Sequence, residues 1–407
     1  MILGSSVKDG TPGAGARSGA ERGAGREQGA GRERGAGREQ GAGREEGAGR
    51  EEGAGPGSEQ DLSAIVLAAG LATRLRPLSS ERPKALLPVG GVSLLRHALG
   101  LLETAGIHRA VVNLHHLGDQ IREAFGSGAS VGFHLEYSDE EGQILGTGGG
   151  VKKVESFFGG RTFAVVNAKI VTDLDLGAVL EHHRSKGALA TMVVRPDSVA
   201  RTWGAVEVES DGRVAGIAGH YRPGADRAPL LPYMFTGIAI LEPGFLEVLP
   251  EGPSSMVQDG YDRHLDADRP IAAYVWDGYW HEHSTPSRYL QGNLNLLHRG
   301  RPLWTNVDMG PVTGVDATAR AHETARIIEP VLIGPGARVE AGARVGPDVI
   351  LGRNSVVGPG VQVDRTVVWS DASVLRNRSS AVVTPQSVLE VDLSDPGARV
   401  GPALASK

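Results

Sequence analysis

The C-terminal third of the chain repeats with a period of six residues, and this repeat constrains the fold more tightly than any other feature of the sequence. Gly-Pro-Gly follows the repeat position at Ile333 and at Val357, and small residues lie four positions after many of the repeats. Apolar or small residues occupy the repeat position ten times in one register: Val315, Ala321, Ile327, Ile333, Val339, Val345, Leu351, Val357, Val363 and Trp369.

A hexapeptide repeat of this length predicts a parallel β-helix, whose stacked coils bury the repeat positions in one continuous core. Three hexads make one coil, so we expect about three coils. A β-sandwich would need hairpin turns at places where this sequence has Gly-Pro. We therefore expect a linker over residues 301–314, a β-helix domain with a C-terminal cap over 315–395, and a tail over 396–407.

Residues 1–60 differ in composition from the rest of the chain. They hold 18 of the 59 glycines, and Gly-Ala-Gly-Arg-Glu-x recurs every six residues from Gly23 to Gly55. Apolar side chains are almost absent, so the segment cannot bury enough surface to offset its ordering entropy. We expect a disordered tail, with an electrostatic docking arm as the alternative interpretation.

Composition limits the cellular compartment and the partners that we expect for the protein. The chain has no cysteine, which excludes disulfides and thiolate metal sites and favours a cytoplasmic protein. A net charge of -6 argues against a nucleic-acid partner. No apolar run reaches the roughly 20 residues that span a membrane, and the first ten residues do not have the apolar core of a secretory signal.

Residues 64–89 contain the features that point to chemistry. An apolar run from Ala64 to Ala69 has the length of a buried parallel strand, and Gly70 ends it. The loop that leaves the carboxyl end of such a strand is where open α/β sheets bind ligands. In this loop Arg74 can bind two phosphate oxygens at once, and Lys84 adds a second, compact positive charge.

This stretch resembles the sugar-1-phosphate nucleotidyltransferases, whose pattern runs G-x-G-T-R-L-x-P-L-T and then P-K-x-L-x-P-V/I. Two positions differ, because Ala72 replaces the second glycine and Ser79 replaces the last threonine. The matching residues are Gly70, Thr73, Arg74, Leu75, Pro77, Leu78, Pro83, Lys84, Leu86, Pro88 and Val89. The catalytic segment with a following β-helix is most similar to mannose-1-phosphate guanylyltransferases and glucose-1-phosphate nucleotidyltransferases.

The resemblance implies a fold and a reaction. The fold would be α/β, with a Rossmann-like, mixed but mostly parallel sheet over residues 61–300, followed by a left-handed parallel β-helix. The reaction would join an NTP, such as GTP, to a sugar 1-phosphate, such as mannose 1-phosphate, giving an NDP-sugar and pyrophosphate. The partners would be these two substrates and, through the β-helix, further copies of the chain.

The resemblance also implies roles for individual residues. Arg74 and Lys84 would be catalytic, with Arg74 on the leaving pyrophosphate. A second family box, L-G-T-A-G, is similar to the segment from Leu145 to Gly149. The expected nucleotide-binding residues are Ala69, Gly70, Leu71, Ala72, Thr73, Gly146, Thr147 and Gly148. The expected sugar-phosphate-binding residues are Gly204, Thr236, Gly237 and Lys169.

The expected metal ligands depart from the family pattern. The family reads N-G-D and W-x-D, and the two aspartates hold Mg²⁺ against the nucleotide phosphates. This chain has Lys169 and Glu282 at those positions. A protonated lysine cannot ligate Mg²⁺, so we expect Mg²⁺ to arrive bound to the NTP, with Glu282 and, less strongly, Asp173 as protein ligands.

Three other interpretations remain. The departure at Lys169 favours, as the alternative to an enzyme, a catalytically impaired homologue that binds a nucleotide sugar and regulates. An acyltransferase built on the β-helix would need a catalytic histidine, and His322 is the only one in the repeats. Strand alternation places His281 and His283 on the face opposite Glu282, which argues against a zinc site.

Overall fold

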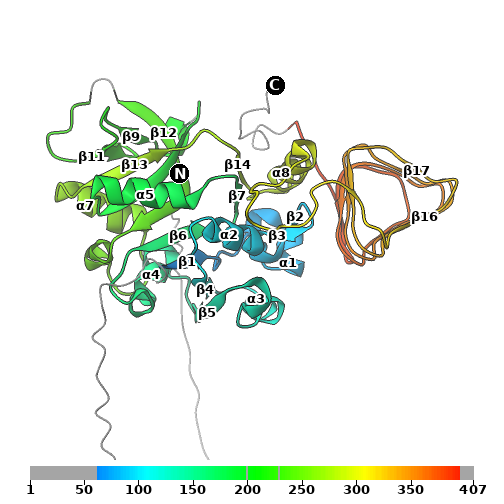
Figure 1. The fold of residues 1–407 in the computed structure, drawn as a ribbon, viewed down its shortest axis with the longest axis horizontal. Coiled ribbons are helices and arrows are strands. Elements are labelled where there is room, and N and C mark those ends of the chain that lie inside the picture. Colours follow the sequence, from blue (N-terminus) through cyan, green and yellow to red (C-terminus); the bar gives the residue numbers. More distant parts are fainter. Residues whose placement is uncertain (1–61, 199, 228–229, 395–407) are drawn as a thin grey trace, which may run out of the picture. The chain divides into compact units, whose positions relative to one another are not determined.

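The computed structural model describes residues 62–198, 200–227 and 230–394. The predicted tails at 1–60 and 396–407 lie outside these residues. The described chain begins with a ten-stranded sheet (Figure 1). Eight strands follow the order β11-β10-β9-β12-β6-β1-β4-β5, while β8 pairs with β12, and β13 pairs with β8. Its strands are β1 (Ser63–Leu67), β4 (Arg109–Leu114), β5 (His134–Asp139), β6 (Phe163–Asn167), β8 (Ala190–Pro196), β9 (Val206–Val208), β10 (Val214–Ile217), β11 (His220–Tyr221), β12 (Leu231–Leu241) and β13 (Ile271–Val275).

The centre of this sheet is parallel, because β6, β1, β4 and β5 pair in parallel, whereas β12 runs antiparallel to β6, β8 and β9. The expected mixed sheet is therefore confirmed. Successive residues of β1 belong to two separate cores, with Ala64 and Val66 in one and Ile65 in the other. This alternation explains why β1 has an unbroken apolar sequence.

Helices cover both faces of the sheet. Leu94 and Leu95 of α2 pack into the core that contains Ala64, and Val151 of α4 packs into the core that contains Ile65. The α-helices are α1 (Leu78–Glu81), α2 (Leu94–Glu103), α3 (Gly118–Phe125), α4 (Gly146–Lys153), α5 (Leu176–Lys186), α6 (Ala200–Trp203), α7 (Asp262–Asp266) and α8 (Pro286–Arg299). No helix among the described residues combines the length and the apolar character needed to cross a membrane.

Two short pairings position the site. β7 (Ile170–Thr172) runs antiparallel to β14 (Trp280–Glu282), and Glu282 pairs with Ile170, the residue after Lys169. β2 (Pro88–Val89) and β3 (Val92–Ser93) form a hairpin shortly after Lys84. α8 follows β14, with the Thr285 side chain as its N-cap and Pro286 at its first turn.

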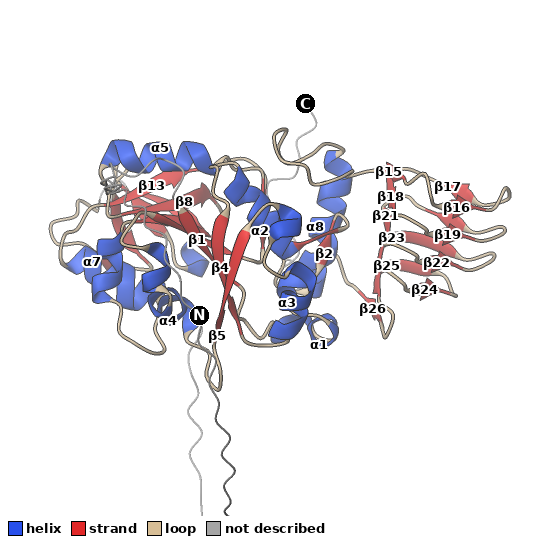
Figure 2. Cartoon of the chain, turned by 60° about the horizontal axis from the view of Figure 1, so that its bottom comes forward, coloured by secondary structure: helices blue, strands red, loops and turns tan. Residues whose placement is uncertain are grey.

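The hexapeptide repeat forms a parallel β-helix (Figure 2). In its first two coils, Arg320 pairs with Arg338 and Arg326 with Arg344, a register of eighteen residues per coil. One of its sheets stacks four strands, β16-β19-β22-β24, so the domain has four coils rather than about three. The strands are β15 (Gly314–Val315), β16 (Arg320–Ala321), β17 (Arg326–Ile327), β18 (Val331–Ile333), β19 (Arg338–Val339), β20 (Arg344–Val345), β21 (Val349–Leu351), β22 (Val356–Val357), β23 (Gln362–Val368), β24 (Ser373–Val374), β25 (Arg378–Val383) and β26 (Val388–Glu390).

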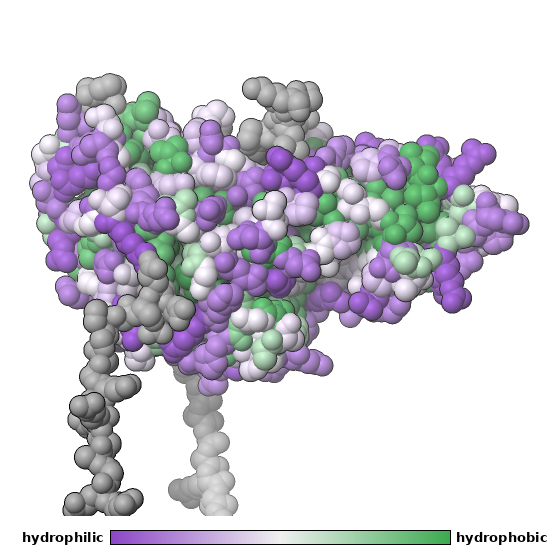
Figure 3. All heavy atoms as spheres, in the orientation of Figure 1, coloured by the Kyte–Doolittle hydropathy of each residue, from purple (hydrophilic) through white to green (hydrophobic). Residues whose placement is uncertain are grey.

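The expectation that the repeat positions are all buried in one continuous β-helix core was wrong at both ends of the repeat. In the first coil Val315 is 52% exposed and Ala321 is exposed, because the strands of this coil have a neighbour on one side only. Figure 3 shows hydrophobic residues gathered on the surface of the β-helix. At the other end the coil shortens, since Val349 pairs with Thr366, and Val368 enters the β-helix core in place of Trp369. Trp369 instead joins the core of the sheet domain.

Candidate active site

The signature loop leaves β1 and turns back on itself through Ala72. Ala72 is left-handed, with φ of 50° and ψ of 35°, at the position where the resembling family has glycine. Its carbonyl accepts hydrogen bonds from the Ser79 hydroxyl at 2.8 Å and from the Leu75 N–H at 2.9 Å. Thr73 and Arg74 are exposed on the turn that follows. A Cβ on Gly70 would meet no protein atom within 4 Å, so packing alone does not require glycine there.

A buried pair that the sequence analysis missed, Asn113 and Glu140, holds this loop. The Asn113 side-chain oxygen accepts from the N–H groups of Ala68 and Ala69, at 2.6 and 3.3 Å. Its amide donates to Glu140 at 2.7 Å, and the other Glu140 oxygen accepts from the Leu145 N–H at 2.8 Å. The signal for these residues lies in their positions, because each follows or ends a strand parallel to β1.

The second glycine box has a packing role that the sequence did not reveal. The N–H groups of Gly148 and Gly149 donate to the carbonyl of Ser254, and the Thr147 hydroxyl accepts from the Met256 N–H. A Cβ on Gly149 would lie 2.1 Å from the Gly252 carbonyl. Gly148, one of the expected nucleotide-binding residues, is buried, and its N–H is bonded within the protein.

Gly146 and Thr147 are exposed at the start of α4, so they remain accessible to a ligand. Ala69 is buried and its N–H is bonded to Asn113, which limits it to supporting the loop. Leu71 is 44% exposed. The accessible part of the expected nucleotide site thus consists of residues 70–74 and the first two residues of α4.

Two cationic side chains flank the Glu282 carboxylate where the carboxyl ends of the central strands meet. The Lys169 Nζ lies 2.6 Å from one oxygen of Glu282, and the Arg288 Nη1 lies 3.4 Å from the other. Arg288 also donates from Nε to the Glu282 carbonyl at 3.0 Å. Lys84 and Arg74 complete the cluster, because their charges act on the same group of residues.

The pKa values in this cluster reflect burial and crowding of like charges. Burial, followed by repulsion from Lys169, lowers the pKa of Lys84 from 10.5 to about 7, although Glu282 opposes the shift. Burial alone raises the pKa of Glu282, but the adjacent Lys169 ammonium and then Arg288 bring it below its usual value. Glu282 is therefore ionised at neutral pH, and the cluster attracts anions.

The residues at the expected metal position do not fit a divalent ion. Lys169 contributes a cation instead of an oxygen, and both Glu282 oxygens already face cations. Asp173 pairs with Arg299 at 2.8 Å and accepts from the Tyr279 N–H at 2.8 Å. Within the described part of the chain, no group of three or more His, Asp or Glu residues is arranged to hold a metal ion.

His281 and His283 point away from the carboxylate, as strand alternation predicts. Both rings are buried against α8, and a Cβ on Gly292 would lie 2.2 Å from the His283 ring. The His281 Nε2–H donates to the Arg288 carbonyl at 2.7 Å, and burial lowers the pKa of His281 to about 4. These neutral rings support α8.

The expected sugar-contacting residues occupy different environments. The Thr236 hydroxyl is buried and donates to the Val193 carbonyl at 2.7 Å, so it supports the sheet instead of facing a ligand. Gly237 has φ of 82°, and a Cβ there would lie 2.3 Å from the Asn167 amide. Gly204 is also left-handed, at φ of 91°.

Arg195 was missed by the sequence analysis. It is only 3% exposed, and its Nη1 donates to the Trp280 carbonyl at 3.3 Å. Arg195 and Arg288 therefore bind alternate carbonyls along one edge of β14. The Arg195 Nε and the Arg288 Nη2 have no partner among the described residues, so both retain a buried donor.

Comparisons with known proteins agree with this geometry. Residues 63–299 match the family described as nucleotidyl transferase, and residues 330–365 match the bacterial transferase hexapeptide (six repeats). A UTP–glucose-1-phosphate uridylyltransferase from Synechocystis sp. is 29% identical over 76% of this chain and 83% of its own length. A mannose-1-phosphate guanylyltransferase from Mycobacterium tuberculosis is 28% identical, over 69% and 77% respectively.

Two further proteins match a little over half of the chain. An N-acetylmuramate α-1-phosphate uridylyltransferase from Caulobacter vibrioides is 30% identical over 57% of this chain and 96% of its own length. The crystal structure of HddC from Yersinia pseudotuberculosis aligns with a TM-score of 0.48 and 22% identity, over 57% of this chain and 99% of that one.

Proposed function

This chain belongs to the nucleotidyl transferase family, and we infer that it transfers a nucleotidyl group from an NTP to a sugar 1-phosphate, giving an NDP-sugar and pyrophosphate. The observation that carries this inference is the contact of Glu282 with Lys169 and Arg288, beside Lys84 and Arg74 of the signature segment, whose charges act on them. Glu282 is paired with two cations, Lys169 and Arg288, and Arg74 adds a third nearby, which favours binding of a polyphosphate.

The reaction needs charge stabilisation and positioning more than acid–base chemistry. The phosphate of the sugar 1-phosphate is already an oxyanion, so it attacks the α-phosphorus directly while the bond to pyrophosphate breaks. Arg74, exposed on the signature loop, holds the leaving pyrophosphate. Lys84 lies between the α-phosphate and the attacking phosphate and stabilises the charge that builds up between them.

We propose that the nucleotide enters over the signature loop. Gly70 supports this proposal, because the space where a Cβ would lie is open and lets a ligand approach the backbone closely. Leu71, Ala72 and Thr73 continue the same surface, and Gly146 and Thr147 border it from α4. Gly204 and Gly237 border the sugar side.

Divalent metal chemistry is usual for the family, but the protein residues here do not fit a resident ion. We propose that Mg²⁺ arrives with the NTP, neutralising its phosphates, while Lys169 provides fixed positive charge beside Glu282. Titrating nucleotide binding with Mg²⁺ and with EDTA tests this proposal. Binding of free Mg²⁺ by the protein without nucleotide would contradict it.

The substrate pair is also a proposal. The similar proteins act with either uridylyl or guanylyl groups, as their names state. GTP with mannose 1-phosphate is the first pair to test, followed by UTP with glucose 1-phosphate. A pyrophosphate-release assay over all four NTPs and a panel of sugar 1-phosphates identifies the pair.

A regulatory role is the second candidate, and the Lys169–Glu282 ion pair is the observation that favours it. Such a protein would bind an NDP-sugar without turnover. We further propose that the protein is cytoplasmic and associates with copies of itself through the β-helix. The exposed first coil, with its unpaired strand edges, supports self-association.

A further inference from the structure

The segment that carries Lys84 is fastened to the β-helix at its N-terminal side. One Glu81 oxygen accepts hydrogen bonds from the Thr384 and Ser387 hydroxyls, both at 2.7 Å. The Arg82 guanidinium lies over the Trp369 ring, 5.0 Å from its centre. Glu81 and Arg82 directly precede Pro83 and Lys84. Both are thus held by residues that lie about 300 positions later in the chain.

The same segment is fastened again at its C-terminal side. The Trp369 Nε1 donates to the Tyr289 hydroxyl at 3.1 Å, and the Tyr289 hydroxyl donates to the Pro88 carbonyl at 2.5 Å. Tyr289 and Trp369 are 0% and 1% exposed. Burial raises the pKa of Tyr289, so its hydroxyl stays protonated and keeps donating to Pro88.

Tyr289 also links this relay to the other side of the active site. It follows Arg288, which pairs with Glu282, on α8. Asn293, one turn later, accepts from the Gly90 N–H at 2.9 Å and donates to the Tyr289 carbonyl at 2.9 Å. α8 therefore fixes the β2–β3 hairpin and Glu282 at the same time.

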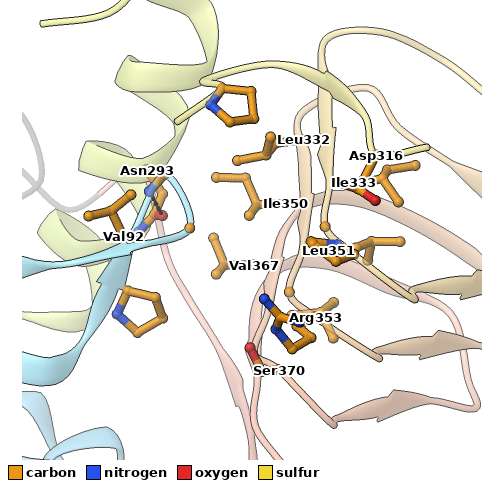
Figure 4. A pocket seen from close by; sticks show the side chains of 18 of the residues that line it. Val92, Asn293, Asp316, Leu332, Ile333, Ile350, Leu351, Arg353, Val367 and Ser370 are labelled. Atoms are coloured by element: carbon orange, nitrogen blue, oxygen red, sulfur yellow. Dashed lines mark hydrogen bonds between the residues drawn. The ribbon is translucent and has the colours of Figure 1, made fainter. Parts of the chain in front are cut away.

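The hairpin packs into the core through Val89, but a hollow lies on its other side. A cavity of about 350 Å³ lies between the hairpin, α8 and the outer face of the β-helix. Leu332, Ile350 and Val367 point into it from the β-helix, and Val92 and Asn293 face it from the other side (Figure 4). On the hollow side, the hydrogen bonds of Tyr289 to Pro88 and of Asn293 to Gly90 hold the hairpin.

We propose that the β-helix is a positioning element for Lys84, acting through Trp369 and Tyr289 on one side and through Thr384 and Ser387 on Glu81 on the other. This inference rests on the proposed function, because it assigns Lys84 to the reacting phosphates. Lys84 begins a single 3₁₀ turn, Lys84–Leu86, between the two fastened points. Releasing either point lets the lysine move relative to the phosphates, and small displacements of this kind reduce turnover strongly.

The experiment compares two matched substitutions in the full chain. Trp369→Phe removes an indole N–H that reaches the Lys84 segment through Tyr289. Trp304→Phe removes an indole N–H that donates at 2.8 Å to the Leu174 carbonyl, away from this relay. We expect similar small losses of thermal midpoint for both. The kcat should fall about tenfold or more for Trp369→Phe alone, with little change in the KM for NTP.

Epistasis tests whether the effect passes through Lys84. In a Lys84→Met background, single-turnover rates remain measurable, and adding Trp369→Phe should lower them no further. Thr384→Val with Ser387→Ala provides a second, independent release and should behave in the same way. A full additional loss in the Lys84→Met background, or equal effects of Trp369→Phe and Trp304→Phe on kcat, would overturn the proposal.

Turnover by the parent protein distinguishes a failure of the positioning inference from a failure of the proposed function. If the parent turns over an NTP and a sugar 1-phosphate but Trp369→Phe leaves its kcat unchanged, the positioning inference fails and the proposed function stands. If the parent has no turnover with any pair, the proposed function fails first. The inference then fails with it, since no reaction depends on Lys84.

Discussion

At the scale of single residues, the site is defined by where its charges sit. A divalent ion held between two carboxylates would be electrically neutral, whereas Lys169, Glu282 and Arg288 together carry one positive charge. The ion pair of Lys169 and Glu282 fills the place of a metal bridge without a metal. Because Glu282 is largely buried, its charge would be costly without these two partners.

Removing Lys169 should therefore weaken nucleotide binding. Lys169→Ala loses a charged contact and leaves the Glu282 carboxylate closer to the phosphates, so we expect a loss of roughly 1.5–3 kcal/mol in NTP affinity by calorimetry. Lys186→Ala is a matched control, because the Lys186 ammonium donates to the Asp211 carbonyl on the exposed surface. An unchanged affinity for Lys169→Ala would remove this residue from the binding site.

The reverse change should create a metal site. Lys169→Asp combined with Arg288→Ala places a second carboxylate beside Glu282 and frees both Glu282 oxygens. We expect the double variant to bind Mn²⁺ in the absence of nucleotide, detected by electron paramagnetic resonance, whereas the parent does not. If the parent binds Mn²⁺ as well as the double variant, the ion pair does not replace a metal.

Lys84 predicts a proton linkage. Its pKa is lowered to about 7 in the free protein, and bound phosphates raise it again, so at about pH 8.5 NTP binding should take up a proton. Calorimetry in buffers of different ionisation enthalpy measures this uptake, which should vanish in Lys84→Met.

The lowered pKa of Lys84 also makes the stability of the protein without nucleotide depend on pH. The unfolded chain binds the proton more readily, so this contribution to stability rises with pH between about 7 and 10.5.

At the scale of elements, burial distinguishes repeat positions that look alike in the sequence. Ile333 and Val315 lie one coil apart in register and are 2% and 52% exposed. Ile333→Asp should cost several kcal/mol in the stability of the β-helix, and Val315→Asp less than about 1 kcal/mol. Denaturant unfolding followed by circular dichroism measures both. Equal losses for the two variants would place the first coil in the core, against the structure.

The sequence predicted those features of the fold that are local and periodic. Local residue patterns alone predict the β1 strand, the hexad register up to Val363 and the start of α8 at Pro286. The shift from Trp369 to Val368 follows from a coil that pairs over seventeen residues, which a fixed period cannot anticipate.

The parts of the site that sequence missed depend on distant partners. Gly149 is required by the carbonyl of Gly252, and Gly150 by the Asn113 and Glu140 side chains. The sequence predicted that Thr236 contacts the sugar phosphate, but in the structure its hydroxyl donates to the Val193 carbonyl. Arg288 and Arg195 gain significance only when the pairing of β7 with β14 brings Lys169 beside Glu282.

At the scale of the whole molecule, the β-helix does two things. Its apolar outer face, with Leu332, Ile350 and Val367, joins the core of the sheet domain. Its first coil leaves Val315 and the strand edges of β15, β16 and β17 exposed, whereas β26 pairs with β25 at the far end. A solenoid end of this kind is normally covered.

We therefore expect copies of the chain to associate through the first coil. Val315→Asp should shift sedimentation toward the monomer without lowering the thermal midpoint. Val388→Asp, at another exposed apolar position near the opposite end of the β-helix, serves as the control. A parent chain that sediments as a monomer at all concentrations, or an assembly unaffected by Val315→Asp, would contradict this expectation.

The most direct test of the account is pyrophosphate release by the full chain with the four NTPs and a panel of sugar 1-phosphates, with Mg²⁺ and with EDTA. We predict an NDP-sugar and stoichiometric pyrophosphate for at least one pair, with turnover strongly reduced in both Lys84→Met and Arg74→Ala. Binding of the NTP should persist in EDTA, because we propose that Lys169, and not a protein-held ion, faces the phosphates. Tight binding of an NDP-sugar with no pyrophosphate released from any pair would contradict the enzyme and favour the regulatory role.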